Sequence, residues 1–593
     1  MRFDALAAAL ERLEANPSRL ESRRLLADLI APLRPPELSR VLYLLQGQIG
    51  PDFEGVKLGV AGSLAARALA AATHHSAEAV SGRARRVGDL GLAAAELVGA
   101  SHRLETETPL TVDEVFEGLR AIATDQGEGS QERKTGRLAA LFARSTPTEA
   151  KFLARLVLGQ LRVGVREMTL LDALAAVYGE GARESREAIE RAFNLSSDLG
   201  DLADRLARGG IAGIARVRLT PGRPVRPMLA ERAGAIEEIE ERMGPSFAVE
   251  YKYDGLRAQA HLPTEGPVRL FSRRLESIEG QFPEVARAIA EAVRIRPAIV
   301  EGECVPIDPS TGRPRPFQEI SRRRGRKHDL DRAQAEVPVV FFAFDALLLG
   351  DRETYEEPYP KRREALAEAV RTGPSVRLAE QRVVEGTDEA LGFFEEVVAE
   401  GAEGIVAKST APESTYRAGS RGFWWIKYKK EYRTDLADSI DGVIVGGFWG
   451  RGRRAGHFGA YLLSVYDPET GRFPTFCKVG SGLDDAALAE LPRRLHEDRC
   501  PEKPPEVDAL MTPDQWFRPR LVLEVRGAEL SRSPVHRAGS GAIAGGSGLA
   551  LRFPRFTGRI RDDKGPTEAT TVSELLRLYE EQRGPRIPKG NPP

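Results

Sequence analysis

The sequence predicts a multidomain protein with an all-α domain, a central α+β domain and a C-terminal β-barrel. Three observations carry this prediction. The chain has 593 residues, and at about 150 residues per domain it can hold several separate cores. The first third is rich in Ala, Leu, Glu and Arg, whereas the four Trp residues all lie in the second half. The spacing of apolar residues also changes along the chain, from helical spacing to a mixture and then to short strands.

Residues 1–216 are predicted to form the all-α domain. Apolar residues recur there every three or four positions, as in LLADLIAPL and AKFLARLVLGQLRVGV. This spacing gathers the apolar side chains on one face of each helix, so that the helices can pack against one another.

The remaining two thirds are predicted to contain the sheets. In residues 217–433, strand-like runs alternate with helical ones such as EVARAIAEAV, which indicates a mixed domain. Residues 434–593 contain five strand-like segments: DGVIVGGFW, GAYLLSVYD, PTFCKVGSG, LVLEVRGAEL and LALRFPRF. Five short strands suit a small closed barrel. EYRTDLADS is the predicted linker between these domains, and the tail RGPRIPKGNPP is expected to be disordered.

Composition argues against several classes of protein. The three cysteines form no CxxC pair, so neither a disulfide scaffold nor a four-cysteine zinc site is expected. No apolar run reaches the roughly 18–20 residues of a membrane helix. The N-terminus also lacks the pattern of a secretory signal. We therefore expect a cytoplasmic protein without a membrane partner.

Net charge alone does not decide whether the partner is a nucleic acid. Lys and Arg number 86 against 87 Asp and Glu, which gives a net charge of −1. Local patches are more informative. SRRRGRK at 321–327 and RGRR at 451–454 are two such basic patches, and each fits a solvated loop as well as a nucleic-acid contact.

Four predicted strands of the central domain carry charged or aromatic residues at two-residue spacing, which places them on one face of each strand. They are Glu250, Lys252 and Asp254 in FAVEYKYDG, Glu301 and Glu303 in PAIVEGECVP, Phe342 and Phe344 in FFAFD, and Trp425, Lys427 and Lys429 in FWWIKYKKEY. One such strand could simply face solvent. Four together predict a pocket with lysines, carboxylates and a stacking ring, which suits a nucleoside triphosphate and a divalent cation.

These motifs resemble those of a known family. EYKYDGLR resembles the KxDGxR nucleotidyl-transfer motif of the ATP-dependent DNA ligases, and FSRR, VEGECV, FFAFD, EGIVAK, WIKYKKEY and RFPRFTGRIRDDK follow in the family's order. LGQLRVGV resembles part of the family's helical DNA-binding domain. KxDG alone is a weak signal, whereas seven ordered motifs are a strong one. One departure is Glu301, where the family commonly carries Asp.

The resemblance is closest to the archaeal and eukaryotic three-domain type and covers nearly the whole chain. It implies a helical DNA-binding domain over 1–216, an adenylation domain over 217–433 and an OB-fold domain over 434–593. It also implies a reaction that seals nicks in duplex DNA during replication, repair and recombination. Lys252 would take AMP from ATP and pass it to the 5′-phosphate of the nick, and the 3′-hydroxyl would then displace AMP.

The resemblance further implies partners and site residues. The cofactors would be ATP and Mg²⁺, with Mn²⁺ as a substitute. The partner would be nicked duplex DNA, with a sliding clamp as a further candidate, and the enzyme would act as a monomer. Lys252 would be the nucleophile, with Asp254 and Gly255 completing its motif. Nucleotide contacts would come from Glu250 near the ribose, Phe344 stacked on adenine, and Arg257, Arg273, Glu303, Arg421, Lys427 and Lys429. Glu303 and Glu403 would hold the metal, and Arg555, Arg559, Arg561 and Lys564 would meet the pyrophosphate.

Three other functions share some of these features. RNA ligases and mRNA-capping nucleotidyltransferases share KxDG and the barrel, but the long helical domain and RFPRF argue against both. An NAD-dependent ligase would need a four-cysteine zinc finger, which three scattered cysteines cannot build. A non-catalytic DNA-binding scaffold would not need the pocket lysines and carboxylates together.

Overall fold

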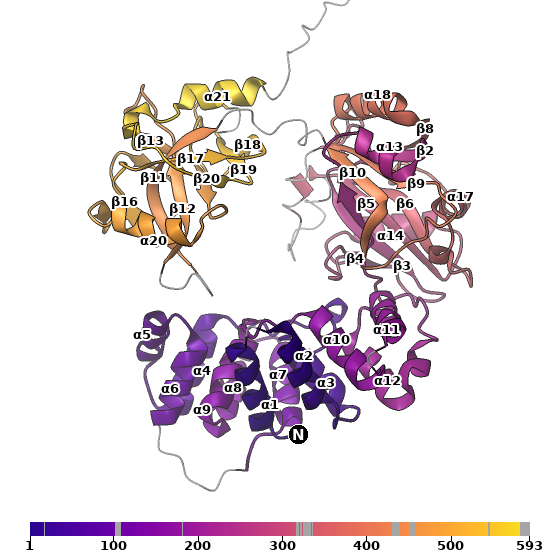
Figure 1. Cartoon of the computed structure of the whole chain (residues 1–593), viewed down its shortest axis with the longest axis horizontal. Helices are drawn as coiled ribbons and strands as arrows, with labels where there is room; N and C mark the ends of the chain where they lie inside the picture. The colour runs from indigo at the N-terminus through magenta and orange to yellow at the C-terminus, as the bar shows by residue number, and fades with distance from the viewer. Residues whose placement is uncertain are drawn as a thin grey trace, which may run out of the picture. The chain divides into compact units, whose positions relative to one another are not determined.

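A computed structural model of the chain divides it into two compact units, Met1–Lys429 and Lys430–Pro593 (Figure 1). The structure describes all residues except 17, 101–107, 181, 316–318, 321–322, 324–333, 335, 430–438, 451–456, 544–545 and 582–593. The patch RGRR, most of SRRRGRK, nearly all of the predicted linker and the whole predicted tail therefore lie outside the described residues. In the described part, no helix is long and apolar enough to span a membrane. The predicted boundaries at 216/217 and 433/434 stay predictions.

The first part of the chain is helical, as predicted. Its helices are α1 (Phe3–Ala15), α2 (Arg19–Ile30), α3 (Glu37–Leu45), α4 (Gly62–Thr73), α5 (Ala77–Val87), α6 (Leu90–Ala100), α7 (Val112–Thr124), α8 (Ser130–Arg144), α9 (Pro147–Val157), α10 (Glu167–Tyr178), α11 (Arg183–Ser196) and α12 (Leu199–Ile214). Two of them begin with a reciprocal capping box, formed by Thr111 with Glu114 at α7 and by Thr146 with Glu149 at α9. Each box satisfies backbone N–H groups that the first helical turn leaves unpaired.

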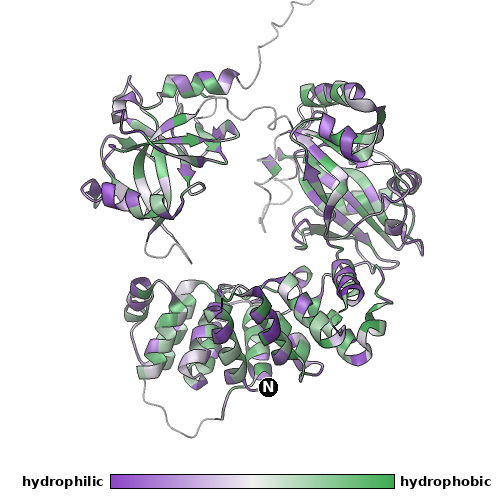
Figure 2. Ribbon diagram, viewed as in Figure 1, coloured by the Kyte–Doolittle hydropathy of each residue, from purple (hydrophilic) through white to green (hydrophobic). Residues whose placement is uncertain are grey.

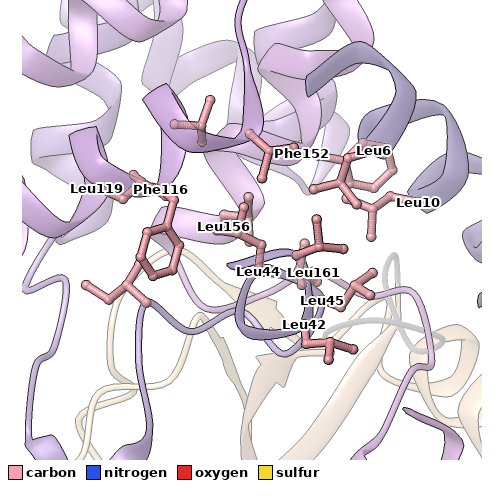
Figure 3. Packing of buried hydrophobic residues seen from close by; sticks show 14 of the residues in the cluster. Leu6, Leu10, Leu42, Leu44, Leu45, Phe116, Leu119, Phe152, Leu156 and Leu161 are labelled. Carbon is pink, nitrogen blue, oxygen red and sulfur yellow. The ribbon is translucent and has the colours of Figure 1, made fainter. Parts of the chain in front are cut away.

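The apolar faces of these helices meet in one core. Helices at the margin bury less: Val80 is the buried residue of α5, which is mainly hydrophilic in Figure 2. Figure 3 shows Leu6 and Leu10 of α1 beside Phe152 of α9, and all three side chains belong to the same buried cluster. The apolar residues that recur at helical spacing in the sequence thus form the packing surface of the domain.

The central domain contains two five-stranded sheets. The first has the order β1-β10-β9-β2-β8 and the second the order β4-β3-β5-β6-β7. The strands are β1 (Leu229–Arg232), β2 (Ser246–Lys252), β3 (Leu256–Leu262), β4 (Arg269–Ser272), β5 (Ala298–Pro306), β6 (Val339–Leu349), β7 (Val376–Leu378), β8 (Gln381–Glu385), β9 (Gly404–Ser409) and β10 (Arg421–Lys429). The helical segments are α13 (Glu237–Met243), α14 (Pro283–Ala292), η2 (Thr354–Glu356), α17 (Tyr359–Ala369) and α18 (Gly386–Ala399).

The connection between β2 and β3 carries the chain from the first sheet to the second. It is the short segment 253–255, and it contains the Asp and Gly of EYKYDGLR. The motif therefore lies where the two sheets adjoin, with Lys252 at the end of one sheet and Arg257 at the start of the other. α14 and α17 pack on the second sheet through an apolar core that includes Val285, Ile289 and Leu366.

The second unit is rich in strands. They are β11 (Ile440–Trp449), β12 (Phe458–Ser464), β13 (Phe473–Val479), β14 (Arg499–Cys500), β15 (Val507–Asp508), β16 (Gln515–Phe517), β17 (Val522–Arg526), β18 (Glu529–Ser533), β19 (Gly548–Arg552) and β20 (Arg555–Ile560). The helical segments are α20 (Asp485–Arg494), η4 (Pro566–Glu568) and α21 (Val572–Glu581).

The pairings of this unit form a curved, barrel-like sheet. β11 pairs with β12 and β17, β12 pairs with β13, and β17 pairs with β20. A parallel bridge between Ser481 and Arg555 links the end of β13 to β20. Each of the five predicted segments contains a strand, but the last two contain two strands each. LALRFPRF breaks between β19 and β20 because Phe553 adopts a φ of 51° and Pro554 has no N–H to donate.

Candidate active site

A pocket of about 440 Å³ lies between the two sheets of the central domain. Residues of both sheets line it. The predicted site residues among them are Glu250, Lys252, Asp254, Gly255, Arg257, Arg273, Glu303, Phe344, Glu403, Arg421, Lys427 and Lys429. Every site residue predicted in the central domain therefore lines the same cavity, although the strands that carry them lie far apart in the sequence.

One carboxylate in this pocket is shared by two lysines. Oε2 of Glu403 lies 2.5 Å from Nζ of Lys252 and 2.9 Å from Nζ of Lys429. The sheet explains the arrangement, because Gly404 is the register partner of Lys252 on one side and of Lys429 on the other. A Cβ at Gly404, whose φ is +149°, would lie 2.2 Å from the carbonyl oxygen of Tyr428. A glycine here lets the three strands meet closely and brings Glu403 between the two ammonium groups.

Two of the four carboxylates that line the pocket, Glu403 and Glu303, have opposite pKa shifts. Burial would raise the pKa of Glu403, but the Lys252 ammonium, with Lys429, outweighs it and lowers the pKa to about 2. Burial raises the pKa of Glu303 to about 7, although Lys252 and Arg257 oppose the rise. Glu403 is therefore ionised at neutral pH, whereas Glu303 holds a proton to a higher pH than an ordinary glutamate. Two carboxyl groups with separated pKa values can take different roles in one site.

A tight turn brings the KxDG motif against Glu303. A Cβ on Gly255 would lie 2.4 Å from the carbonyl oxygen of Cys304 and 2.8 Å from Cγ of Glu303. Only glycine allows this approach without displacing β5. Arg257 then pairs in register with Glu303, so that the motif and the two glutamates of β5 adjoin.

Glu250 is buried, with 2% of its surface exposed. Its Oε2 lies 2.7 Å from Nζ of Lys408, and the hydroxyl of Tyr359 donates to its Oε1. Burial lowers the pKa of Lys408, while Glu250 opposes the shift. Lys408, the lysine of EGIVAK, was not singled out from the sequence. Its place at the end of EGIVAK, one of the ordered motifs, is the signal that could have identified it.

The aromatic wall consists of Phe344 and Trp425, whose rings meet edge to face with centroids 6.1 Å apart. Nζ of Lys408 lies 4.9 Å from the centroid of Phe344 and 4.5 Å from that of Trp425. The guanidinium of Arg257 lies 5.3 Å and 5.5 Å from the same two centroids. Cations over aromatic faces stabilise this wall. Trp425 lies on the strand face that it shares with Lys427 and Lys429.

The pocket also carries several cations that are less deeply buried. Arg273 and Arg421 are exposed, and Lys427 is half-buried. Burial and the neighbouring Arg421 lower the pKa of Lys427. Among the described residues that line the cavity, lysines and arginines outnumber carboxylates. This excess of positive charge provides a binding surface for a polyphosphate.

The basic residues of the terminal motif lie in the second unit. Arg561 and Lys564 both pair with Asp441, at 2.7 Å and 2.6 Å. Arg559 has 61% of its side chain exposed and lies 3.7 Å from Glu524. Arg555, which is exposed, begins β20. Asp441 was not identified from the sequence, because its two partners follow it by more than a hundred residues.

Comparison with known proteins places these motifs in a family. Residues 227–429 match the model described as ATP dependent DNA ligase domain, residues 2–175 match DNA ligase N terminus, and residues 454–564 match ATP dependent DNA ligase C terminal region. A DNA ligase of Pyrobaculum calidifontis is 44% identical over 588 residues, which cover 98% of this chain and 99% of that protein. A probable DNA ligase of Aquifex aeolicus is 42% identical over 587 residues, which cover 99% of this chain and all of that protein.

A solved structure supports the fold. The structure named "Pmar-Lig_Pre." covers 94% of this chain and 99% of its own, with a TM-score of 0.55 at 15% identity. The predicted fold class is thus confirmed, and neither the RNA ligases nor the capping enzymes are favoured by these relatives. The identity to DNA ligases over nearly the whole length decides the assignment: the chain is an enzyme of the ATP-dependent DNA ligase family.

Proposed function

We propose that this ligase seals nicks in duplex DNA through a lysyl-AMP intermediate on Lys252. The observation that carries the proposal is the position of this lysine in a cavity lined by cations and closed on one side by aromatic rings. Nζ of Lys252 attacks the α-phosphorus of ATP, and pyrophosphate leaves. An oxygen of the 5′-phosphate then attacks the same phosphorus and frees the lysine. Finally the 3′-hydroxyl attacks the 5′-phosphorus, and AMP leaves.

The pocket supplies both position and charge for the first step. Glu403 fixes the Lys252 side chain through the 2.5 Å contact, and Lys252 must lose a proton before its nitrogen can attack. Arg257, Lys427 and Lys429 stabilise the charge that develops on the phosphate oxygens. Phe344 offers a ring face to the adenine, and Glu250 lies near the ribose.

The carboxylates of the pocket fit a magnesium ion that arrives with its nucleotide. Mg²⁺ in such sites usually takes one or two protein carboxylates, and phosphates and water supply the other ligands. Glu303 and Glu403 provide those two carboxylates, and Mn²⁺ accepts the same oxygen ligands. Among the described residues, no group of three or more His, Cys, Asp or Glu side chains is placed to hold an ion without other ligands. When bound, the ion would neutralise phosphate charge and orient the leaving pyrophosphate.

The helical domain and the barrel contact the DNA substrate. The helical domain grips the duplex on both sides of the nick through Lys and Arg contacts to phosphates. Arg555, Arg559, Arg561 and Lys564 meet the pyrophosphate in the first step, after which the barrel turns about the linker and meets the duplex. The enzyme acts as a cytoplasmic monomer in replication, repair and recombination, and a sliding clamp recruits it.

Labelled nucleotides test this function. The protein is incubated separately with α-labelled ATP, GTP and NAD, and then with nicked DNA or nicked RNA. We expect a covalent AMP adduct from ATP, its loss in Lys252→Ala, and transfer of the label to nicked DNA. Lys361→Ala, which changes an exposed lysine of α17, is the matched control and should keep the adduct. Label transfer to RNA but not to DNA would favour an RNA ligase, and an adduct from NAD alone would overturn ATP dependence.

A further inference from the structure

Arg257 is held by a set of buried groups on the side of β3 that faces the segment before β1. Its Nη2 donates to Oε2 of Glu301 at 2.7 Å and to the hydroxyl oxygen of Tyr416 at 3.3 Å. Its Nη1 donates to the carbonyl oxygen of Met228 at 2.8 Å. Three acceptors from three separate parts of the chain therefore fix the plane of one guanidinium.

Tyr416 occupies the centre of this arrangement. Its hydroxyl donates to Oε2 of Glu301 at 2.9 Å and accepts from the N–H of Met228 at 2.9 Å. A phenol has a single hydrogen to donate, so its oxygen must be the acceptor for Arg257 as well as for Met228. Tyr416 is 3% exposed and Glu301 is 1% exposed, so water cannot replace either partner without a local opening.

A second chain of hydrogen bonds fixes Glu301 from behind. Oε1 of Glu301 accepts from Nε2 of Gln259 at 3.1 Å. Oε1 of Gln259 accepts from the N–H of Val225 and lies 2.7 Å from Nε2 of His261, whose Nδ1 accepts from the N–H of Gly222. Because Nδ1 accepts, His261 is neutral and donates through Nε2. The side-chain N–H groups of Gln259 and His261 therefore have their acceptors, and both carboxylate oxygens of Glu301 are fixed.

The same groups fasten the connector that follows the helical domain. Residues 222–228 bond to this set through Gly222, Val225 and Met228. The connector is also attached to α11, because the N–H of Arg226 donates to the carbonyl oxygen of Asn194 and its guanidinium lies 4.3 Å from the centroid of Phe193. A continuous series of contacts thus leads from α11 through the connector to a side chain that lines the nucleotide pocket.

We propose that Glu301 and Tyr416 are positioning residues for Arg257, and that through Met228 they fasten the nucleotide pocket to the connector from the helical domain. The proposal rests on the role in nucleotide binding proposed above for Arg257. Neither Glu301 nor Tyr416 is among the described residues that line the pocket. Both act through the guanidinium, which lies against the rings of Phe344 and Trp425.

Full-length variants test this role through ATP binding, measured with labelled ATP in EDTA so that no chemistry follows. Tyr416→Phe removes one hydroxyl and should raise the dissociation constant of ATP about fivefold, whereas Glu301→Gln should raise it about tenfold or more because it removes a charged partner. Tyr355→Phe is the matched control. Tyr355 belongs to the same apolar cluster as Tyr416, but its hydroxyl bonds to Arg191 and Glu356. Its substitution should leave ATP binding unchanged.

A double-mutant cycle separates positioning from a general effect on the fold. If Tyr416 acts through Arg257, Tyr416→Phe should have no further effect on ATP binding in an Arg257→Ala background. Independent, multiplying effects would overturn the proposal. Where Arg257→Ala binds ATP too weakly to measure, Arg257→Lys takes its place, because an ammonium cannot reproduce the planar set of contacts.

The outcomes also separate this proposal from the function on which it rests. If Arg257→Ala leaves ATP binding unchanged while the adduct on Lys252 still forms, Arg257 has no role in nucleotide binding and the positioning proposal fails alone. If Arg257→Ala weakens ATP binding but Tyr416→Phe and Glu301→Gln do not, Glu301 and Tyr416 do not position the arginine, and the proposal is again wrong. Absence of the adduct from wild-type protein would instead overturn the proposed function.

Discussion

Two regions of this ligase place one carboxylate between two cations, but their surroundings differ. In the central domain Glu403 contacts Lys252 and Lys429. In the second unit Asp441 contacts Arg561 and Lys564. The first set lines a pocket of about 440 Å³ that also contains Glu303 and several further cations. A shared carboxylate is therefore a common way to fix two cations, and the adjoining cavity is what makes the first pair available to a substrate.

Of the substitutions in these two regions, a change at Lys252 is expected to have the largest effect on activity. Lys252→Ala should abolish both the AMP adduct and nick sealing, because an alanine offers no nucleophile. Lys252→Arg should also fail, since a guanidinium stays protonated at any accessible pH. The measurement is gel detection of the labelled adduct, followed by sealing of a nicked duplex. An adduct at the wild-type level in either variant would remove Lys252 as the nucleophile.

The next effect concerns the shared carboxylate itself. Glu403→Gln keeps the shape of the side chain but removes the charge that fixes both lysines. We expect adduct formation to slow by about 10²–10³-fold, the range for removing one preorganised electrostatic group from an active site. ATP affinity should change much less, because the base and ribose are bound elsewhere in the pocket. Rates at several magnesium concentrations provide the measurement.

Glu400→Gln is the control for this prediction. Glu400 lies three residues earlier, is exposed and accepts from the hydroxyl of Tyr251. It should leave adduct formation nearly unchanged.

Glu303→Gln should also slow catalysis more than it weakens ATP binding. A variant of either pocket glutamate with unchanged activity at low magnesium would exclude that residue from the metal site.

The sequence predicted the pocket better than it predicted what supports the pocket. Residues at two-residue spacing share a strand face, so the positions of Lys252, Glu303 and Lys427 could be read from short segments. Lys408 was missed because a single lysine at the end of an apolar strand has no repeating pattern around it. The contacts of Glu301 with Tyr416 join residues more than a hundred positions apart, and no local pattern encodes such a pairing.

The corresponding change in the second unit should separate the steps of the reaction. Arg559→Ala combined with Lys564→Ala removes the exposed arginine and one of the two partners of Asp441. We expect adduct formation from ATP to fall by about tenfold or more, because these cations would stabilise the departing pyrophosphate. Sealing of a chemically pre-adenylated nick needs no pyrophosphate release and should continue. Arg577→Ala, on the exposed face of α21, is the control.

Equal reductions on the two substrates would contradict a separate role in the first step. The terminal motif would then be a structural strand of the barrel. The double variant retains Arg561, so Asp441 keeps its contact at 2.7 Å and the barrel keeps that connection.

A smaller effect on chemistry is expected when the helical domain is removed. A fragment containing residues 217–593 keeps the pocket and the connector 222–228, so it should still form lysyl-AMP. Its affinity for nicked DNA should fall, and log affinity should depend less steeply on log salt, by about 0.9 for each phosphate that the fragment no longer neutralises. Binding titrations at several salt concentrations provide the measurement. Unchanged affinity and an unchanged slope would show that the helical domain does not grip the duplex.

The smallest expected effect distinguishes Glu303 from Glu403. Burial raises the pKa of Glu303 to about 7, above its ordinary value, so the folded protein binds a proton at this group more tightly than the unfolded chain. Between the ordinary pKa and about 7, this group makes folding less stable as pH rises. Glu303→Gln removes that penalty. Because the side chain is only partly buried, we expect the variant to melt about 1–2 °C above the wild type at pH 8, with the difference vanishing near pH 4. A variant that melts lower at pH 8 would show that the charged form of Glu303 is stabilised by Lys252 and Arg257 more strongly than burial penalises it.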